Sequence, residues 1–295
     1  MEIIEFNAEL NVKKYRAINP CVLALGFFDG VHKGHQELLE VARSIAKEKS
    51  LELSVMTFFP HPSNVLLNKK KINQYLTPKE GKVAIFEELN IDKVYIVNFD
   101  TQFSKIPYEQ FIEDYIVGLS CEHVVAGFDF TFGHMGKGNM DILQKESRNR
   151  FDVSVIKKVE YKNEKISSSA IRELLNKGNV AKIPHYLGNH YCVNGTIRRQ
   201  SNGLFIDVDW QYLLPTPGLY IVEIEMQHVS YIENCIISNN HSIRVLQDFT
   251  TFMKFDQQLK IKLHILEKQP NTVYQLPIQS TDLGGELDEK ISIVY

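Results

Sequence analysis

The chain has 295 residues and a formal net charge of −3, with 44% hydrophobic and 23% charged residues, which is an ordinary composition for a globular protein. This length favours two domains, each able to bury its own core. The charge balance excludes a general attraction to nucleic acid or to an anionic membrane surface, so an anionic ligand must be held by a dedicated site. We therefore expect small-molecule partners, no nucleic acid and no membrane, and leave a homo-oligomer open.

The four cysteines, Cys21, Cys121, Cys192 and Cys235, lie far apart and form no Cys-x-x-Cys pair. This spacing is not that of a zinc module or a disulfide framework, so reduced thiols are expected. The first residues lack a basic segment followed by an apolar core, and no run of about 18 apolar residues occurs. The sequence therefore predicts a cytoplasmic protein, and we expect no protein-bound metal.

The first half is organised around the stretch from Val22 to His35, VLALGFFDGVHKGH. Val22–Phe28 has the apolar character of a buried strand, and the apolar residues between Leu38 and Ala46 recur at the spacing of an amphipathic helix. Glycines in the turn between these elements let a polyphosphate approach the backbone. The helix start adds free N–H groups and a positive dipole. This stretch therefore predicts a nucleotide-binding turn.

Two histidines, His32 and His35, follow that turn at a spacing of three residues. If the helix has begun by Val31, both imidazoles lie on one face of its first turn and point at the same phosphate chain. A metal site is an alternative, although zinc usually needs three or four ligands and this pair supplies two. Two solvated histidines at a helix start are the remaining interpretation.

Strands and helices alternate as far as about residue 184. Strands are expected at Ile3–Phe6, Leu51–Phe59, Lys93–Phe99, Cys121–Ala126 and Val153–Val159. Helices are expected from a capping box at Thr77–Glu80 to about Leu89, over Pro107–Ile116, over Met140–Ser147 with Asn139 as its cap, and from the 166–172 segment to Gly178. The alternation predicts a parallel sheet covered on both faces, with ligands outside the carboxyl ends of its strands.

The segment Ile166–Arg172, ISSSAIR, opens the last of these helices. Three hydroxyls at a helix start, with the cation of Arg172 about one turn further on, predict a second phosphate cradle. A simple serine-rich helix cap is the alternative.

Short strands replace this alternation after His185. They are expected at Tyr191–Arg198, Leu204–Val208, Gly218–Met226, Tyr231–Ile237, Ser242–Asp248 and Leu259–Glu267, with a turn at Leu213–Gly218. This spacing predicts a small antiparallel barrel as a second domain. The end of the chain, Thr281–Tyr295, is expected to form a helix or a strand at the edge.

Four motifs in order, at Gly26–His35, Thr57–Pro62, Gly127–Gly133 and Ile166–Arg172, resemble the prokaryotic FAD synthetase family. The resemblance implies an α/β fold: a Rossmann-like nucleotidyltransferase domain with a parallel sheet over residues 1–184, carrying FMN adenylyltransferase activity. It further implies a riboflavin kinase-like antiparallel β-barrel over residues 187–295.

The resemblance also implies the residues of the site. Catalytic roles fall on His32, His35 and Arg172. ATP contacts fall on Gly26, Phe27, Phe28, Asp29, Gly30, Gly34, Asn139, Ser167, Ser168 and Ser169. Flavin contacts fall on Phe58, Pro60, His61, Pro62, Asp129 and Phe130, although some of these phenylalanines alternate as core residues of a strand do. ATP and FMN are the implied substrates, with Mg²⁺ bridging phosphate oxygens.

The barrel departs from that family. No Pro-Thr-Ala-Asn stretch occurs, and the corresponding region reads Gly203–Trp210, GLFIDVDW. The position expected for a catalytic glutamate matches Arg244, a cation where a general base belongs. We therefore predict that kinase activity is absent. Asp207 and Asp209 are candidates for a metal in an altered kinase site, although alternating acids on a strand more often face solvent.

Three other functions stay open at this point. One is a bifunctional riboflavin kinase/FMN adenylyltransferase. A second is a nucleotidyltransferase for pantetheine phosphate, nicotinate nucleotide or a small alcohol phosphate. The third is a flavin-sensing regulator whose barrel binds flavin or a macromolecule without catalysis.

Overall fold

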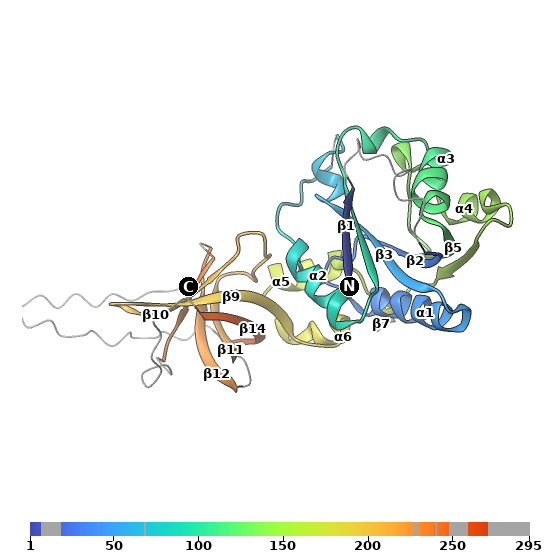
Figure 1. Cartoon of the computed structure of the whole chain (residues 1–295). Coiled ribbons are helices and arrows are strands. Elements are labelled where there is room, and N and C mark those ends of the chain that lie inside the picture. Colours follow the sequence, from blue (N-terminus) through green and yellow to red (C-terminus); the bar gives the residue numbers. More distant parts are fainter. Residues whose placement is uncertain (7–18, 68, 227–228, 240, 248–258, 271–295) are drawn as a thin grey trace, which may run out of the picture. The chain divides into compact units, whose positions relative to one another are not determined.

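The structure is a computed structural model that describes residues 1–6, 19–67, 69–226, 229–239, 241–247 and 259–270 (Figure 1). These residues form two compact units. The first contains the described residues from Met1 to Arg172 together with His185–Gly188 and Gln211–Leu213. The second contains Glu173–Pro184, Asn189–Trp210 and the described residues from Leu214 onward. The element predicted at Thr281–Tyr295 lies outside the described residues.

The first unit contains a six-stranded sheet in the order β1-β4-β3-β2-β5-β6. Its strands are β1 Glu2–Phe6, β2 Cys21–Leu25, β3 Glu52–Phe59, β4 Lys93–Asn98, β5 Cys121–Gly127 and β6 Asp152–Ile156. All neighbouring strands pair in parallel. Strand order reverses between β2 and β5, and ligands of such sheets bind beyond the carboxyl ends at this switch point.

Helices cover both faces of this sheet because its strands are apolar on both sides. Val22 and Ala24 of β2 join a core cluster with residues of α1 (Lys33–Lys49) and α2 (Lys79–Glu88). Leu23 and Leu25 point the other way, into a cluster with residues of α3 (Tyr108–Phe111) and α4 (Met140–Ser147). Figure 1 shows α1 and α2 on one side of the sheet and α3 and α4 on the other. The predicted parallel, Rossmann-like architecture is confirmed.

Three details differ from the sequence-based expectation. Strand β2 ends at Leu25 and not at Phe28, because Phe28 takes a positive φ of 55° that no strand residue adopts. The capping box at Thr77 is wrong: Pro78 occupies the cap position of α2, and no side chain caps this helix. The predicted helix over 107–116 is α3 followed by a π-helical turn over Ile112–Ile116 and a 3₁₀ turn over Val117–Leu119.

The second unit contains a closed antiparallel barrel in the order β10-β13-β12-β11-β14-β9. Its strands are β9 Tyr191–Gln200, β10 Gly203–Val208, β11 Gly218–Met226, β12 Val229–Ile237, β13 Ser242–Val245 and β14 Leu259–Lys268. Every second residue of β11 is buried, as the period of two requires for a closed sheet with one inner face. The predicted barrel is confirmed.

The remaining elements are short. A two-stranded ribbon joins β7 (Glu160–Tyr161) to β8 (Glu164–Lys165), and α5 (Ser168–Asn176) and α6 (Pro184–Leu187) follow it. Among the described helices, none is long and apolar enough to cross a membrane.

Candidate active site

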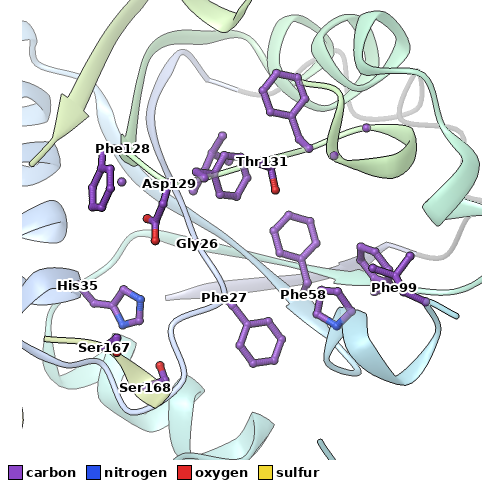
Figure 2. Close-up of a pocket in the computed structure, with 18 of the residues that line it drawn as sticks. Gly26, Phe27, His35, Phe58, Phe99, Phe128, Asp129, Thr131, Ser167 and Ser168 are labelled. Carbon is purple, nitrogen blue, oxygen red and sulfur yellow. The ribbon is translucent and has the colours of Figure 1, made fainter. Parts of the chain in front are cut away.

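A cavity of about 1120 Å³ opens at the carboxyl ends of the sheet strands. It is lined by residues at or just after the ends of β2, β3, β4, β5 and β6, and by the start of α5. Figure 2 shows His35, Ser167 and Ser168 at one end and the rings of Phe58 and Phe99 at the other. The cavity therefore has a polar end and an aromatic end, and its volume suits more than one small molecule.

The turn after β2 needs glycine at its first position. A Cβ atom at position 26 would lie 2.9 Å from Cζ of Phe28, so the Phe28 ring occupies the space of a side chain. That ring is fully buried and meets Phe86 edge to face at 5.6 Å. Phe28 and Gly30 both have positive φ, 55° and 83°. The buried Phe28 ring thus packs against the turn, and the backbone at Gly26 faces the cavity.

His32 lies at the cap of α1, one residue before the helix begins at Lys33. The condition that the helix begin by Val31 is therefore not met, yet the two imidazoles still converge. Nδ1 of His32 accepts a hydrogen bond from the backbone N–H of His35 at 3.3 Å, and the two rings stack with centroids 3.7 Å apart. In neutral His32 this bond puts the ring proton on Nε2, so that Nε2 is a donor.

Both imidazoles are neutral at pH 7 in the free protein. Burial lowers the pKa of His32 to about 4. Burial, and next the charge of His32, lower the pKa of His35 well below its ordinary value. Two stacked rings cannot both carry charge cheaply in a buried place. The pair therefore offers hydrogen bonds to an incoming anion, and a bound anion would favour protonation.

Asp29 is a buried hub beneath the turn. Its side chain is 3% exposed and accepts a hydrogen bond from Arg172 at 2.6 Å and from the backbone N–H of Thr77 at 3.0 Å. Arg172 also donates to the backbone carbonyl of Gln74 at 2.8 Å. The guanidinium predicted for phosphate is thus engaged by Asp29 and does not line the cavity. Arg172 joins α5 to the turn.

The three serines of the second motif all line the cavity. Ser167 caps α5, since its Oγ accepts a hydrogen bond from the backbone N–H of Ala170 at 3.2 Å. Ser168 donates its hydroxyl proton to the backbone carbonyl of Asp29 at 2.8 Å. The hydroxyl protons of Ser167 and Ser169 have no described acceptor, so both hydroxyls can donate to a ligand.

The aromatic end is built on β3, β4 and the segment after β5. Phe58 meets Phe99 edge to face at 6.3 Å and lies nearly parallel to Phe130 at 6.4 Å. Pro62 lines the cavity as well. His61 does not line it: its ring packs against Phe27 at 4.6 Å, and burial lowers its pKa to about 4. Stacked and edge-on rings around an open space are a suitable wall for a flat aromatic ligand.

The structure brings most of the predicted residues to one cavity and leaves others behind its wall. Those that line it are Gly26, Phe27, His32, Gly34, His35, Phe58, Pro62, Asp129, Phe130, Ser167, Ser168 and Ser169. Those that do not are Phe28, Asp29, Gly30, Pro60, His61, Asn139 and Arg172. Asn139 is exposed and caps α4 by accepting from the backbone N–H of Ile142 at 2.9 Å, which is the capping role expected from the sequence.

Three lysines of the cavity, Lys157, Lys158 and Lys165, were missed by the sequence reasoning. Lys157 and Lys158 directly follow β6, and the rule that ligands bind beyond strand ends would have identified them. Lys165 forms an ion pair with Asp129 and lies 4.7 Å from the centre of the Phe128 ring. Lys158 pairs with Glu160 at 2.7 Å, so Lys157 is the one of the three without a described carboxylate partner.

No group of three or more histidine, cysteine or acidic side chains able to hold a metal occurs in the part of the chain described. The two acids of the site region, Asp29 and Asp129, are each paired with a cation. In the barrel, Asp207 is held by Arg198 at 2.7 Å and by Ser242 at 3.1 Å.

A parallel sheet whose glycine-containing turn and aromatic wall both face one cavity identifies the molecule, by class, as a nucleotidyltransferase of Rossmann-like fold. Residues 14–170 match the protein family described as FAD synthetase. The chain belongs to the FAD synthetase family and carries its FMN adenylyltransferase activity.

Individual relatives extend the match beyond the sheet unit. A bifunctional riboflavin kinase/FMN adenylyltransferase of Listeria monocytogenes is 38% identical over 275 residues, 90% of this chain and 84% of the relative. A FAD synthetase of the same organism is 30% identical over 226 residues, 76% of this chain and 86% of the relative. The crystal structure of a protein described as a macrolide-efflux protein of Streptococcus pneumoniae aligns with a TM-score of 0.77 and 25% identity, over 91% of this chain and all of that one.

Proposed function

We propose that this chain transfers the AMP moiety of MgATP to the phosphate of FMN at the cavity of the sheet unit, and that it does not phosphorylate riboflavin. One observation carries the first part: a single cavity combines a phosphate-binding turn with a wall of phenylalanine rings. A nucleotide polyphosphate suits the polar end, and an isoalloxazine ring suits the aromatic end.

The reaction needs alignment more than acid–base catalysis. The phosphate of FMN is an anion at neutral pH, so one of its oxygens attacks the α-phosphorus of ATP directly. A bond forms between that oxygen and the α-phosphorus, the bond from the α-phosphorus to the bridging oxygen breaks, and pyrophosphate leaves. Catalysis then depends on an in-line arrangement and on neutralising the charge that moves toward pyrophosphate.

The proposed roles follow from the donors that point into the cavity. Nε2 of His32 donates a hydrogen bond to the polyphosphate, and His35 beside it donates to the oxygen on which charge develops. The Ser167 hydroxyl and the N–H groups at the start of α5 bind the leaving phosphates. Lys157, which pairs with no described carboxylate, adds positive charge at the same end, and Lys158 and Lys165 are further donors there. Arg172 acts through Asp29, by holding the turn.

In this proposal Mg²⁺ enters as part of the MgATP substrate. Two findings support that role: the described residues contain no metal-binding cluster, and the acids of the site region are already paired. When bound, the ion neutralises phosphate charge.

The proposed loss of kinase activity rests on the barrel. Arg244 on β13 lies opposite Phe205 of β10, and its guanidinium donates to the carbonyl of Asn202 at 3.4 Å. Asp207 is neutralised by Arg198. A cation at the position matched to a general base cannot take a proton from the riboflavin hydroxyl. The curated relative that is bifunctional makes retained kinase activity the alternative.

One chromatographic assay tests both parts. The purified protein is incubated with MgATP and, separately, with FMN or with riboflavin. We expect FAD from FMN and unchanged riboflavin. FMN or FAD formed from riboflavin at a rate near that of FAD synthesis would overturn the kinase proposal, and no FAD from FMN would overturn the transferase roles and favour the flavin-sensing alternative.

We further propose residues 1–184 as the adenylyltransferase domain and 187–295 as the barrel domain, in a cytoplasmic protein. The four free cysteines support a reducing compartment. The state of assembly stays a prediction for sedimentation analysis.

A further inference from the structure

Lys82 of α2 is a buried lysine that the proposed reaction does not use. Its residue is 2% exposed, and it does not line the cavity. Lysine is almost never fully buried unless its charge is compensated. Lys82 forms no ion pair with any described carboxylate, so hydrogen bonds, a ring contact and the more distant charge of Asp29 compensate its burial.

The partners of Lys82 belong to the wall of the cavity. Its Nζ donates to the backbone carbonyl of Phe27 at 3.0 Å and to Oγ1 of Thr57 at 3.4 Å. Thr57 itself donates to the same Phe27 carbonyl at 2.9 Å. The ammonium also lies 4.3 Å from the centre of the Phe27 ring, a cation–π contact. Lys82 thus contacts Phe27 both at its backbone carbonyl and at its ring.

Phe27 is the residue through which this hold reaches the ligand. It lines the cavity beside Gly26 (Figure 2), and its ring meets that of His61 at 4.6 Å. The next residue, Phe28, has a positive φ and opens the phosphate-binding turn. Displacing the Phe27 carbonyl therefore displaces both the turn and part of the aromatic wall.

Lys93 offers an internal comparison. It is also a buried lysine, at 7% exposure, but it pairs with Glu52 at 2.9 Å and with Glu2 at 3.4 Å. It is the first residue of β4, at the edge of the sheet opposite the strand ends that form the site. The burial of Lys93 is accounted for by two carboxylates, whereas Lys82 is bound to a carbonyl, a hydroxyl and a ring of the cavity wall.

We propose that Lys82 is a positioning residue for adenylyl transfer: its ammonium fixes the Phe27 carbonyl and ring, and so sets the turn against which the polyphosphate lies. The inference rests on the proposed function and adds a residue to it. Misplacing a reacting group by about 1 Å can cost 100-fold in rate, so a buried residue behind the wall can control turnover.

The charged and titratable groups around Lys82 define a pH signature. Burial lowers the pKa of Lys82 to about 8, and the carboxylate of Asp29 opposes this effect. Arg172 bonds that carboxylate, and the charge of Lys82 in turn lowers the pKa of His35 and of His61. The pKa values of both histidines lie below their ordinary value, so neither titrates near pH 8. An ammonium that loses its proton near pH 8 should therefore give kcat an alkaline limb there.

The test compares Lys82→Met, Lys82→Arg and Lys93→Met in steady-state FAD synthesis from FMN and MgATP between pH 6.5 and 9.5. We expect Lys82→Met to lower kcat about 10- to 100-fold with KM for ATP changed less than about 3-fold, and to remove the alkaline limb. Lys82→Arg keeps a permanent charge, so its kcat should exceed that of Lys82→Met, and its profile should lack that limb. Lys93→Met should keep the wild-type kcat and pH profile, even where its melting temperature falls.

Thr57→Val provides a second arm should Lys82→Met fail to fold. It removes the other donor to the Phe27 carbonyl and should lower kcat about 3- to 10-fold. Wild-type kcat and pH profile in Lys82→Met or, failing that variant, in Thr57→Val would overturn the inference. So would an equal loss in Lys93→Met. If the wild-type protein itself makes no FAD, the proposed function fails instead, which keeps the two failures distinct.

Discussion

Each of the two units contains an arginine–aspartate ion pair, but the two pairs differ in burial and in the residues that they connect. In the sheet unit, Asp29 and Arg172 are 143 residues apart and meet where their side chains are 3% and 17% exposed. In the barrel, Arg198 and Asp207 are nine residues apart on adjacent strands, and their side chains are 36% and 44% exposed. The first pair holds the turn after β2 in place, whereas the second joins the neighbouring strands β9 and β10 at the surface of the barrel.

The largest expected effect tests this contrast directly. Asp29→Ala leaves Arg172 buried without its partner, and breaking a buried pair in this way costs about 3–5 kcal/mol. For the sheet unit this predicts a fall of roughly 10 °C in its melting temperature, measured by calorimetry. The matched variant Asp207→Ala breaks the exposed pair of the barrel, and should cost at most about 1 kcal/mol. Equal losses in the two variants would contradict the contrast.

The next effect concerns turnover. His35→Gln removes the imidazole that we propose to contact the polyphosphate and keeps a polar side chain, so kcat for FAD synthesis should fall about 100- to 1000-fold. KM for FMN should change less than about 3-fold, because the aromatic end is untouched. The measurement is steady-state kinetics at saturating MgATP. Parallel losses of FMN affinity and of rate would instead indicate a damaged fold.

A smaller effect is expected for stability at low pH. The pKa values of His32, His35 and His61 are lowered by burial in the folded protein, to about 4 for His32 and His61. The unfolded chain therefore binds protons more readily below pH 6.5, and the free energy of unfolding falls as the pH drops from 6.5 toward 4. His32 alone accounts for at most about 3 kcal/mol of that loss.

Urea titrations at pH 7, 5.5 and 4.5 measure this dependence. His32→Gln should flatten it, whereas His190→Gln, at an exposed position, should leave it unchanged. The same slope in both variants would show that buried histidines of the site do not carry the effect.

The smallest effect is expected at the barrel. Arg244→Glu restores the residue type expected of a general base, but the Gly203–Trp210 region still lacks the nucleotide-binding stretch. We expect no detectable phosphorylation of riboflavin with MgATP and an unchanged rate of FAD synthesis. Formation of FMN would mean that the substitution at position 244 alone accounts for the lack of kinase activity, and that the rest of the kinase site is intact.

The local sequence pattern predicted most of the helices and strands, but it could not predict contacts between residues that are far apart in the chain. The period-two burial of β11 and the apolar run of β2 are visible in the sequence, because one residue's neighbours in a strand decide them. The end of β2 at Leu25 was missed, since it depends on Phe28 packing against Phe86 far along the chain. The predicted capping box at Thr77 is wrong for the same reason, because the backbone N–H of Thr77 donates to the side chain of the distant Asp29.

The sequence predicted which motifs form the site, but not the charge states and ion pairs of its side chains. His32, His35 and Ser167 line the cavity, as the spacing and the family resemblance had indicated. The sequence could not show that burial keeps both imidazoles neutral, or that Arg172 is engaged by Asp29. It also gave no sign of Lys82, whose partners, Phe27 and Thr57, lie 55 and 25 residues away.

The convergence on Asp29 has a consequence for biosynthesis. Its partners are Thr77 and, much later, Arg172. At synthesis rates of about 5–20 residues per second, the ribosome needs on the order of 10 s to advance from the codon of Asp29 to that of Arg172. During that interval the nascent chain carries this carboxylate without its guanidinium. The turn after β2 is thus completed from the far end of its domain, and a chain truncated before residue 172 lacks the guanidinium that holds Asp29.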